Sequence, residues 1–533
     1  MSPDVLVVGA GPTGLTTALQ AHDLGAAVRV VERRPTAFRP SRAMILHPRT
    51  LEALRRLGAA DAILERADHS PRARVHVGGR VLDVRLADVA WPSTPYPHLT
   101  LVRQADVEAV LAEALHERGV PVERGVELLT ARTGPHRAHA TLRTGGSTEE
   151  VACAFVAGCD GPDSTVRRAA RIGWRGGTYR TEVVLADAEL DGDLAPGMLH
   201  VVVGRAGLLF VFALGEGATW RVLATRPATG GGPSGQPGDA VPAAQVAALL
   251  DRSGLRTRLA ALRWSARVPL QHRLATAFRR GRLFLAGDAA HAHSPAAAQG
   301  MNTGILDAAN LGWKLAVAAR GGGGETLLAS YEAERRPVAR RVLALTHVVF
   351  AAEASTGPLP ALLRARVLPV AAPAVPALAG EPHLMATVVR LLSQDWATYR
   401  RSPLSAGAAG RRPRPGDRLP DRDVTCRGRT RRLHDLTSVP GFHVLLDRDA
   451  PPGAGAGLGP LVRTHRLTSS PGRGVVVVRP DGHVGLSARE VDPDDVAAWL
   501  ARAGATRAGV PAAARTPGPR RRGPAGTAGS RPS

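Results

Sequence analysis

The pattern of apolar positions predicts a β-α-β unit within the first thirty residues. An apolar run over 4–8 indicates a buried parallel strand, and residues 14–24 indicate a helix that stops at Gly25. A second apolar run over 28–31 ends in Glu32. Further helices are predicted over 49–57 and 106–118. This order of elements favours an α/β fold built on a parallel sheet.

The pattern changes in the middle of the chain. Apolar and polar residues alternate over 177–226, which predicts a sheet-rich insertion. A short strand over 283–286 and a helix beginning near Met301 then return to the α/β pattern. A helix over 325–350, broken or kinked at Pro337, is followed by a helical stretch with many prolines as far as about Leu404.

These shifts divide the 533 residues into several units, as the length also favours. Two strand signals after a Gly- and Pro-rich linker indicate a small separate α/β domain near the end. We therefore expect a discontinuous first domain over 1–175 and 270–345, a β-rich insertion over 176–269, a helical region and linker over 346–410, a C-terminal domain over 411–505 and a disordered tail over 506–533.

Composition limits the classes of partner and binding site that are expected. The formal net charge of +23 comes from dispersed arginines, with Lys314 the single lysine, and no nucleic-acid-binding motif is present, so no nucleic-acid partner is expected. Three cysteines without metal-ligand spacing argue against a disulfide framework or a metal site. The first residues enter a strand directly, and no apolar run is long enough for a membrane span. A cytoplasmic protein, monomer or homodimer, is expected.

The first motif is Gly9-x-Gly11-x-x-Gly14, between the first strand and its helix. Gly9 permits a tight turn, Gly11 lets backbone N–H groups approach a pyrophosphate, and Gly14 lets the helix pack on the strand. Glu32, at the end of the next strand, can accept hydrogen bonds from both hydroxyls of an adenosine ribose. The motif predicts a dinucleotide site, although a glycine-rich turn without a ligand has the same letters; Glu32 and the following Arg33 favour FAD over NAD.

Two later motifs also follow strands. Asp160-Gly161 comes after an apolar strand, with Arg167 on the next helix, and by itself reads as ordinary turn chemistry. In "GRLFLAGDAAHAHSPAAAQGMNTG", Gly287 turns the chain and Asp288 stands at the carboxyl end of a strand, where open α/β sheets bind ligands. The helix near Met301 would point free N–H groups back at that ligand. This segment predicts a site for a polyol and an anion.

The three motifs, in this order and spacing, resemble the class A flavoprotein monooxygenases, the para-hydroxybenzoate hydroxylase-like group, over roughly residues 1–400. The C-terminal part resembles the thioredoxin-like appendage of actinobacterial aromatic polyketide hydroxylases, and with Cys426 alone it has no C-x-x-C pair for redox chemistry. The resemblance implies a Rossmann-like FAD-binding domain with an inserted β-sheet substrate domain and a C-terminal thioredoxin-like domain.

The resemblance also implies which residues bind the cofactor. Asp288 would bind the ribityl hydroxyls of FAD, and the start of the helix at 300–302 would offer N–H groups to the flavin edge around N1 and C2=O. Asp160 and Arg167 would serve both FAD and the nicotinamide nucleotide. The implied cofactor-binding residues are Gly9, Gly11, Pro12, Thr13, Gly14, Glu32, Arg33, Arg42, Arg103, Gln104, Asp160, Arg167, Gly287, Asp288, Pro295, Gly300, Met301 and Asn302.

The family's cycle would reduce FAD with NADPH or NADH bound transiently and form a flavin C4a-hydroperoxide with O₂. One oxygen atom would then enter a polycyclic aromatic, polyketide-type substrate. No catalytic acid or base is assigned: His47, His291 and His293 lie in the motif segments but are expected to be structural. The family commonly has Gly-Gly where this chain has Ala297-Ala298, and alanine tolerates positive φ less well.

Several alternatives stay open. Within the class, the reaction could be Baeyer–Villiger oxidation or epoxidation. A flavin-dependent reductase or halogenase could use the same scaffold, although the halogenase Trp-x-Trp-x-Ile-Pro stretch is absent. A non-catalytic FAD-binding protein is the third alternative.

Overall fold

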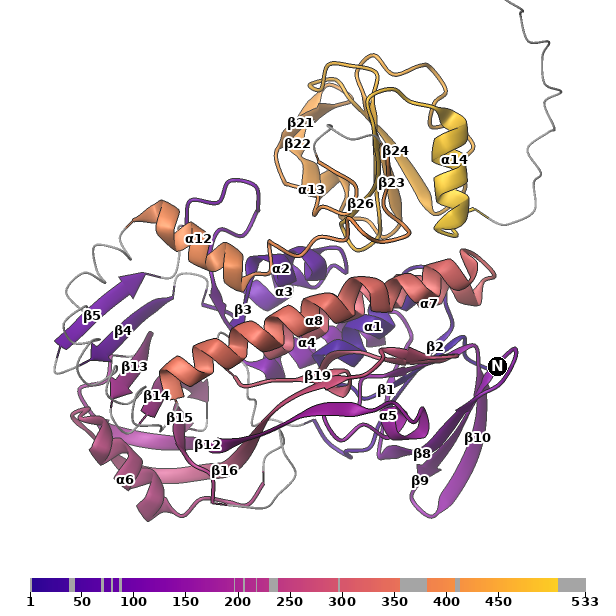
Figure 1. Cartoon of the computed structure of the whole chain (residues 1–533). Helices are drawn as coiled ribbons and strands as arrows, with labels where there is room; N and C mark the ends of the chain where they lie inside the picture. Colours follow the sequence, from indigo (N-terminus) through magenta and orange to yellow (C-terminus); the bar gives the residue numbers. More distant parts are fainter. Residues whose placement is uncertain are drawn as a thin grey trace, which may run out of the picture.

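The computed structural model describes most of the chain, namely residues 2–37, 44–68, 71–77, 80–85, 89–195, 197–204, 207–216, 218–229, 238–295, 298–354, 381–407 and 413–506. Two large sheets, two long helices and a C-terminal domain make up this part (Figure 1). Within it, no helix combines the length and the apolar character that a bilayer crossing requires.

The first sheet confirms the predicted β-α-β unit. Strand β1 (Val5–Val8) is central and pairs in parallel with β2 (Val28–Glu32) and β11 (Phe155–Gly158), so their carboxyl ends share one edge. The helix α1 (Pro12–His22) connects β1 to β2 and packs on α7. The full order is β17 (Arg279–Arg280), β18 (Leu283–Leu285), β11, β1, β2, β7 (Val122–Arg124).

The second sheet has eight strands, and most of them come from the segment where a β-rich insertion is expected. Its longest strands, β12 (Trp174–Gly192) and β16 (Thr257–Ala275), pair along most of their length. They extend from the second sheet toward the first (Figure 1). Two strands from outside the expected insertion extend it, because β4 pairs in parallel with β13. The order is β19 (His291–Ala292), β16, β12, β15 (Ala218–Pro227), β14 (Gly207–Glu216), β13 (Met198–Gly204), β4 (Arg72–Val77), β5 (Arg80–Arg85).

Smaller elements complete these two layers. Helix α6 (Ala243–Ser253) covers one face of the second sheet through Val246 and Leu250, which are fully buried. The others are β3 (Ile45–Leu46), α2 (Pro48–Arg55), α3 (Ala60–Leu64), β6 (Thr100–Leu101), α4 (Gln104–Glu117), β8 (Val126–Thr133), β9 (Ala138–Thr144), β10 (Ser147–Cys153), α5 (Thr165–Ala169) and η1 (Gly287–Ala289).

Two long helices cross the molecule. Helix α7 (Gln299–Ala319) is almost entirely buried, and α8 (Gly324–Ala354) packs along it. Of the break or kink predicted at Pro337, the break is wrong, because α8 continues through this residue. Val338 and Val342 are buried beyond the proline, and this packing offsets the backbone hydrogen bond that proline cannot make. The expected boundary at residue 345 therefore lies inside one helix.

The C-terminal domain is a seven-stranded sheet with helices at its sides. Its core is continuous with that of the first domain, since Phe442 packs edge-on against Trp313 of α7. The helices are α12 (Pro382–Leu392), which precedes the domain, α13 (Leu433–Leu436) and α14 (Pro493–Arg502). The strand order is β20 (Ala406–Gly407), β26 (Val484–Ala488), β25 (Val475–Val478), β23 (Phe442–Asp447), β24 (Val462–Leu467), β21 (Asp423–Cys426), β22 (Arg429–Arg432).

Candidate functional site

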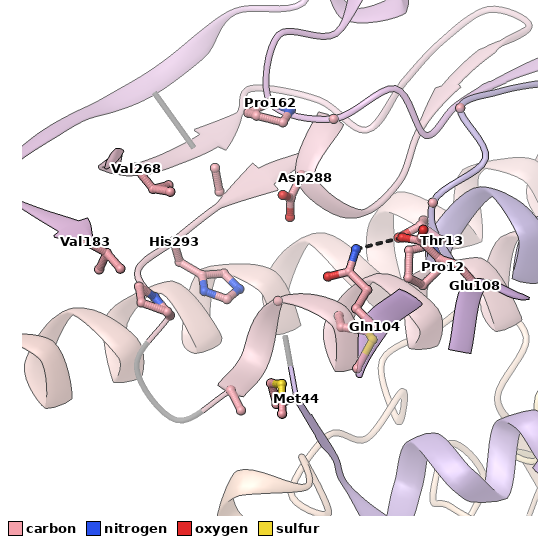
Figure 2. Close-up of a pocket in the computed structure, with 18 of the residues that line it drawn as sticks. Pro12, Thr13, Met44, Gln104, Glu108, Pro162, Val183, Val268, Asp288 and His293 are labelled. Carbon is pink, nitrogen blue, oxygen red and sulfur yellow. Dashed lines mark hydrogen bonds between the residues drawn. The ribbon is translucent and has the colours of Figure 1, made fainter. Parts of the chain in front are cut away.

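A cavity of about 510 Å³ connects the carboxyl edge of the first sheet to the face of the second. Its volume falls in the range of small-molecule and cofactor sites. Figure 2 shows polar residues such as Thr13, Gln104 and Asp288 at one end, and Val183 and Val268 at the other. The cavity therefore has a polar end on the first sheet and an apolar end on the second.

The three glycines of the first motif have different neighbours. A Cβ on Gly9, whose φ is +103°, would lie 2.3 Å from the Cys159 carbonyl oxygen, and a Cβ on Gly14 would lie 1.8 Å from the Gly9 carbonyl oxygen. Both glycines are thus required by the close packing of α1 against β1 and β11. Gly11 is different, because a Cβ there would meet nothing within 4 Å. It precedes α1 without a side-chain cap, so the N–H groups of the first turn are available to an anion in the cavity.

Glu32 forms the floor beside this turn. Its carboxylate accepts hydrogen bonds from the backbone N–H of Ala10 at 2.9 Å and of Arg34 at 3.0 Å. These bonds fix the carboxylate at the cavity wall, where its remaining lone pairs can accept ribose hydroxyls. Glu32 thus lies at the end of β2, beside the glycine turn, and its role in binding a ribose stays a prediction.

Helix α4 adds a carboxyl group that the sequence analysis missed. Gln104 donates to Oε1 of Glu108 at 2.8 Å, and both residues line the cavity. Burial raises the pKa of Glu108 to about 7. The signal was present, because residues four apart lie on one helix face. Arg103 does not line the cavity and forms an ion pair with Asp106.

Asp160 lies at the carboxyl end of β11. Its Oδ2 accepts from the N–H groups of Thr165 and Val166 at 2.7 and 3.1 Å, which caps α5. Its Oδ1 is buried and has no hydrogen-bond partner among the described residues. Arg167 supports the same turn, donating to the carbonyl oxygens of Ala289 and Pro162. Asp160 thus has one structural oxygen and one that can accept from a ligand.

The segment after β18 is held by Asp307, another residue that the sequence analysis missed. Gly287 has a φ of +59°, and a Cβ there would lie 2.5 Å from the Thr13 hydroxyl oxygen. Asp307 accepts from the Gly287 N–H at 3.1 Å, from Nε2 of His291 at 2.6 Å and from Arg335 at 2.6 Å. The contact of His291 with Asp307 agrees with the structural role expected for this histidine. These contacts fix the backbone that presents Asp288 to the cavity.

Helix α7 begins at the same cavity. Ala298, the residue before it, has a φ of +51° and provides no side-chain cap, so Gly300 and Met301 present the open N-terminus of α7 to the cavity. Asn302 faces away: its side chain accepts from the His47 N–H and the Thr50 hydroxyl and donates to the Ile45 carbonyl oxygen. It therefore anchors the start of α2 to α7.

The other end of the cavity is a wall of apolar side chains on β12, β14 and β16, closed by the end of α8. Its members include Leu185, Leu208, Phe210, Phe212, Val268 and Phe350. Most of these side chains occupy alternating positions on strands, so they face the same side of the sheet. Their sequence pattern does not indicate which ligand they bind. This end suits a large apolar or aromatic molecule.

The structure thus brings together most of the predicted site residues. Gly14, Arg103, Arg167, Gly287 and Asn302 lie behind the lining, and Arg42 is outside the described residues. No cluster of side chains suited to a metal ion occurs in the described part of the chain. The cavity-lining members are Gly9, Gly11, Pro12, Thr13, Glu32, Arg33, Gln104, Asp160, Asp288, Pro295, Gly300 and Met301.

The lining fits FAD. The open space above Gly11 and the uncapped start of α1 match a pyrophosphate, and Glu32 is placed for the adenosine ribose. The unpaired Oδ1 of Asp160 requires a donor such as a hydroxyl. The uncapped start of α7 suits the negative edge of a reduced flavin.

Comparison with known proteins agrees with this geometry. The FAD binding domain family matches residues 2–346. The 6-methylpretetramide 4-monooxygenase of Streptomyces rimosus is 38% identical over 374 residues, 70% of this chain and 64% of that enzyme, so the match spans just under two thirds of the relative's length.

Solved structures match over nearly the whole chain. The OxyS anhydrotetracycline hydroxylase from Streptomyces rimosus has a TM-score of 0.74 and 27% identity, with 94% of this chain and 99% of that chain covered. A ternary complex of aklavinone-11 hydroxylase with FAD and aklavinone has a TM-score of 0.73 and 25% identity, with 95% and 99% covered. The expectation of FAD as the cofactor is confirmed, and the chain belongs to the FAD binding domain family.

Proposed function

We propose that the protein is an FAD-dependent monooxygenase that consumes NADPH or NADH and inserts one oxygen atom from O₂ into a polycyclic aromatic, polyketide-type substrate. The observation that supports this most is the cavity itself, in which a cofactor end and an apolar end meet at the start of α7. The names of the relatives, monooxygenases and hydroxylases of tetracyclic compounds, agree with it.

FAD supplies the capacity to take electrons from a nicotinamide nucleotide and to activate O₂. The chain binds and orients. The first turn of α1 and Glu32 would hold the dinucleotide, and Asp288 and Asp160 would accept hydrogen bonds from its hydroxyls. The start of α7 would stabilise negative charge on a bound flavin, and the apolar wall would exclude water from the reacting atoms.

The test is turnover by the purified full-length protein. Flavin absorbance, NAD(P)H consumption stimulated by members of an anthraquinone and angucycline panel, and a product heavier by one oxygen atom are expected. NMR analysis of the product separates hydroxylation from lactone formation or epoxidation. Product formation without O₂ would favour a reductase, and bound FAD with no NAD(P)H consumption on any compound would favour a non-catalytic protein.

We also propose that the C-terminal domain is thioredoxin-like and has no redox role. The strand pairing supports this proposal. β23 pairs in parallel with β24 and antiparallel with β25, and β25 pairs antiparallel with β26. The resulting order, β24-β23-β25-β26, places β23, the first of these strands in the chain, in the interior of the sheet, and α14 follows the last strand. Cys426 is a buried free cysteine. Replacing Cys426 with Ser should therefore leave NAD(P)H consumption unchanged. A large loss of NAD(P)H consumption in this variant would contradict the proposal that the domain has no redox role.

A further inference from the structure

The loop between β19 and α7 contains two histidines with different hydrogen bonding. Nε2 of His291 is bonded to Asp307. Nδ1 of His293 lies 2.9 Å from the Ser294 carbonyl oxygen, which can only accept, so Nδ1 carries the proton. Nε2 of a neutral His293 is then an acceptor. This nitrogen is buried and has no partner among the described residues, so it is a polar atom that a ligand can satisfy.

His293 lies where the two ends of the cavity meet. Figure 2 shows its ring between Val183 and Val268 on the apolar side and Asp288 on the cofactor side. The ring faces the start of α7, because a Cβ on Gly300 would lie 3.9 Å from its Cε1 atom, the carbon bonded to Nε2. A molecule placed against the apolar wall and reaching toward the cofactor end would pass the His293 side chain.

The surroundings favour neutral imidazole. Burial lowers the pKa of His293, and the neighbouring His291, whose ring is parallel at 6.2 Å, lowers it further. Asp288 on η1 and Asp307 on α7 act in the opposite direction but do not outweigh burial. Tyr179 on β12 interacts with Ser294, and His347 on α8 and His272 on β16 pack against Tyr179. His293 therefore has a neutral ring near neutral pH, with a lone pair on Nε2 that can accept a proton or a hydrogen bond.

We propose that His293 is a catalytic residue that takes the proton from a phenolic or enolic hydroxyl of the aromatic substrate. The substrate O–H bond breaks, an N–H bond forms at Nε2, and the electron pair left on oxygen enters the ring. This makes the ring carbons ortho and para to that oxygen more reactive toward an electrophilic oxygen atom. Oxygen insertion leaves a dienone, whose attacked carbon gives its hydrogen as a proton to solvent water. The C–H electron pair restores the aromatic ring and the negative charge on the substrate oxygen, and imidazolium returns its proton to that oxygen. The second oxygen atom of O₂ leaves as water, with the two electrons that the nicotinamide nucleotide supplies. This inference rests on the proposed function.

The first experiment follows the ionisation of a bound phenol. The holoenzyme is mixed with 2-hydroxyanthraquinone, whose visible spectrum distinguishes phenol from phenolate, over a pH series. The bound compound should ionise in wild type at a pH at least about one unit lower than in His293→Asn. The asparagine of this variant retains a donor for the Ser294 carbonyl oxygen. His116→Asn, exposed near the end of α4 and not among the cavity-lining residues, is the matched control. Absence of binding, or the same ionisation curve in wild type and His293→Asn, would overturn the proposal.

The second experiment separates this inference from the proposed function. On a phenolic panel compound that stimulates wild-type NADPH consumption, His293→Asn should lower kcat about 100-fold, the usual scale for a lost general base. His293→Gln, which keeps an acceptor but is not basic, should recover KM without recovering kcat. Both should retain FAD. If wild type is active and kcat is unchanged in His293→Asn, only the proposed role of His293 is contradicted. If no compound stimulates NADPH consumption by wild type, the proposed function is contradicted, and this inference with it.

Discussion

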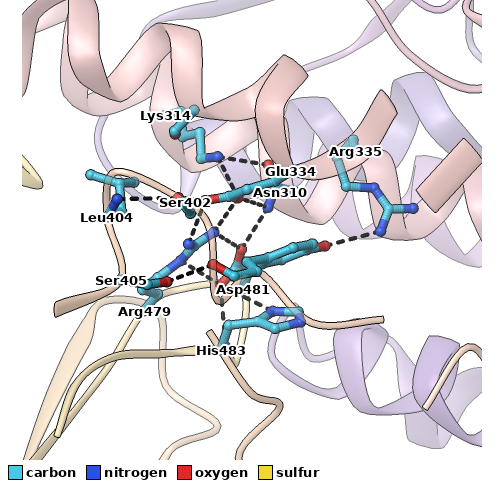
Figure 3. Close-up of polar contacts among 12 residues, drawn as sticks. Asn310, Lys314, Glu334, Arg335, Ser402, Leu404, Ser405, Arg479, Asp481 and His483 are labelled. Atoms are coloured by element: carbon cyan, nitrogen blue, oxygen red, sulfur yellow. Dashed lines mark hydrogen bonds and ion pairs between the residues drawn. The ribbon is translucent and has the colours of Figure 1, made fainter. Parts of the chain in front are cut away.

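Arg479, in the C-terminal domain, donates to both carboxylate oxygens of Glu334 on α8, each at 2.7 Å (Figure 3). Lys314 on α7 donates to the same carboxylate at 2.7 Å, and Asp481 accepts from Arg479 at 2.5 Å. All four side chains are at most 2% exposed. The two domains are therefore joined by charges that water cannot solvate, and each charge depends on its partners.

Replacing Arg479 with Met should destabilise the protein by about 3 kcal/mol or more, because Glu334 and Asp481 would stay buried with their charge undercompensated. Denaturant unfolding followed by tryptophan fluorescence measures this, since Trp313 and Trp499 are buried near the interface. The control is Arg258→Met, whose ion pair with Asp191 is solvent-exposed and should contribute less than about 1 kcal/mol. Equal losses in the two variants would contradict the interface role.

The glycine motif makes a second prediction, because Gly11 and Gly14 have different reasons to be glycine. Gly14→Ala should destabilise the apoprotein, since its Cβ would meet the Gly9 backbone. Gly11→Ala should leave the melting temperature of the apoprotein near that of wild type but weaken FAD binding at least tenfold, because its methyl group would occupy the space for the pyrophosphate. Thermal unfolding of apoprotein and flavin fluorescence titration measure the two effects. Loss of apoprotein stability in Gly11→Ala would show that the position is structural.

The cofactor end of the cavity was predictable because its requirements are local. A glycine turn, an acid at a strand end and a strand-to-helix loop each need particular residues within a few positions, so Gly11, Glu32 and Asp288 could be placed from their spacing. Asp307 and Glu108 sit on the same helices as predicted residues but were missed, because their role depends on burial and on distant partners such as Arg335.

The apolar end was not predictable to the same degree. Its side chains come from strands that pair far apart in sequence, as β4 with β13, and an apolar residue on a strand has the same pattern whether it faces a core or a ligand. Pro337 is a second case in which the neighbouring sequence does not decide the structure. The preference of proline to end a helix is overridden by the packing of α8, whose residues Val338 and Val342 are buried beyond the proline.

A third prediction concerns Ala298, which has a φ of +51°, where alanine is strained and glycine is not. Ala298→Gly should stabilise the protein by up to about 1 kcal/mol, because relief of this strain outweighs the added freedom of the unfolded chain. The matched control is Ala308→Gly inside α7, which should destabilise by about 1 kcal/mol. Thermal unfolding of both variants gives the signs, and a destabilised Ala298→Gly would mean that the loop does not hold this conformation in solution.

Glu108 predicts a dependence of stability on pH. Its pKa is raised from 4.5 to about 7 by burial, so between these values the folded protein retains a proton that the unfolded chain has lost. The contribution of Glu108 to stability is therefore most favourable below pH 4.5 and declines as the pH rises through 7. Glu108→Gln has no such proton, so the melting temperature of the variant relative to wild type should rise between pH 5 and pH 8.

The control is Glu113→Gln, on the same helix, with a side chain that is 66% exposed. Its melting temperature should follow that of wild type at every pH, because the substitution changes no buried group. Thermal unfolding of apoprotein at pH 5, 6, 7 and 8 compares the three proteins. A constant difference between Glu108→Gln and wild type over this range would mean that the carboxyl of Glu108 is ionised in the folded protein throughout, and that water reaches this end of the cavity.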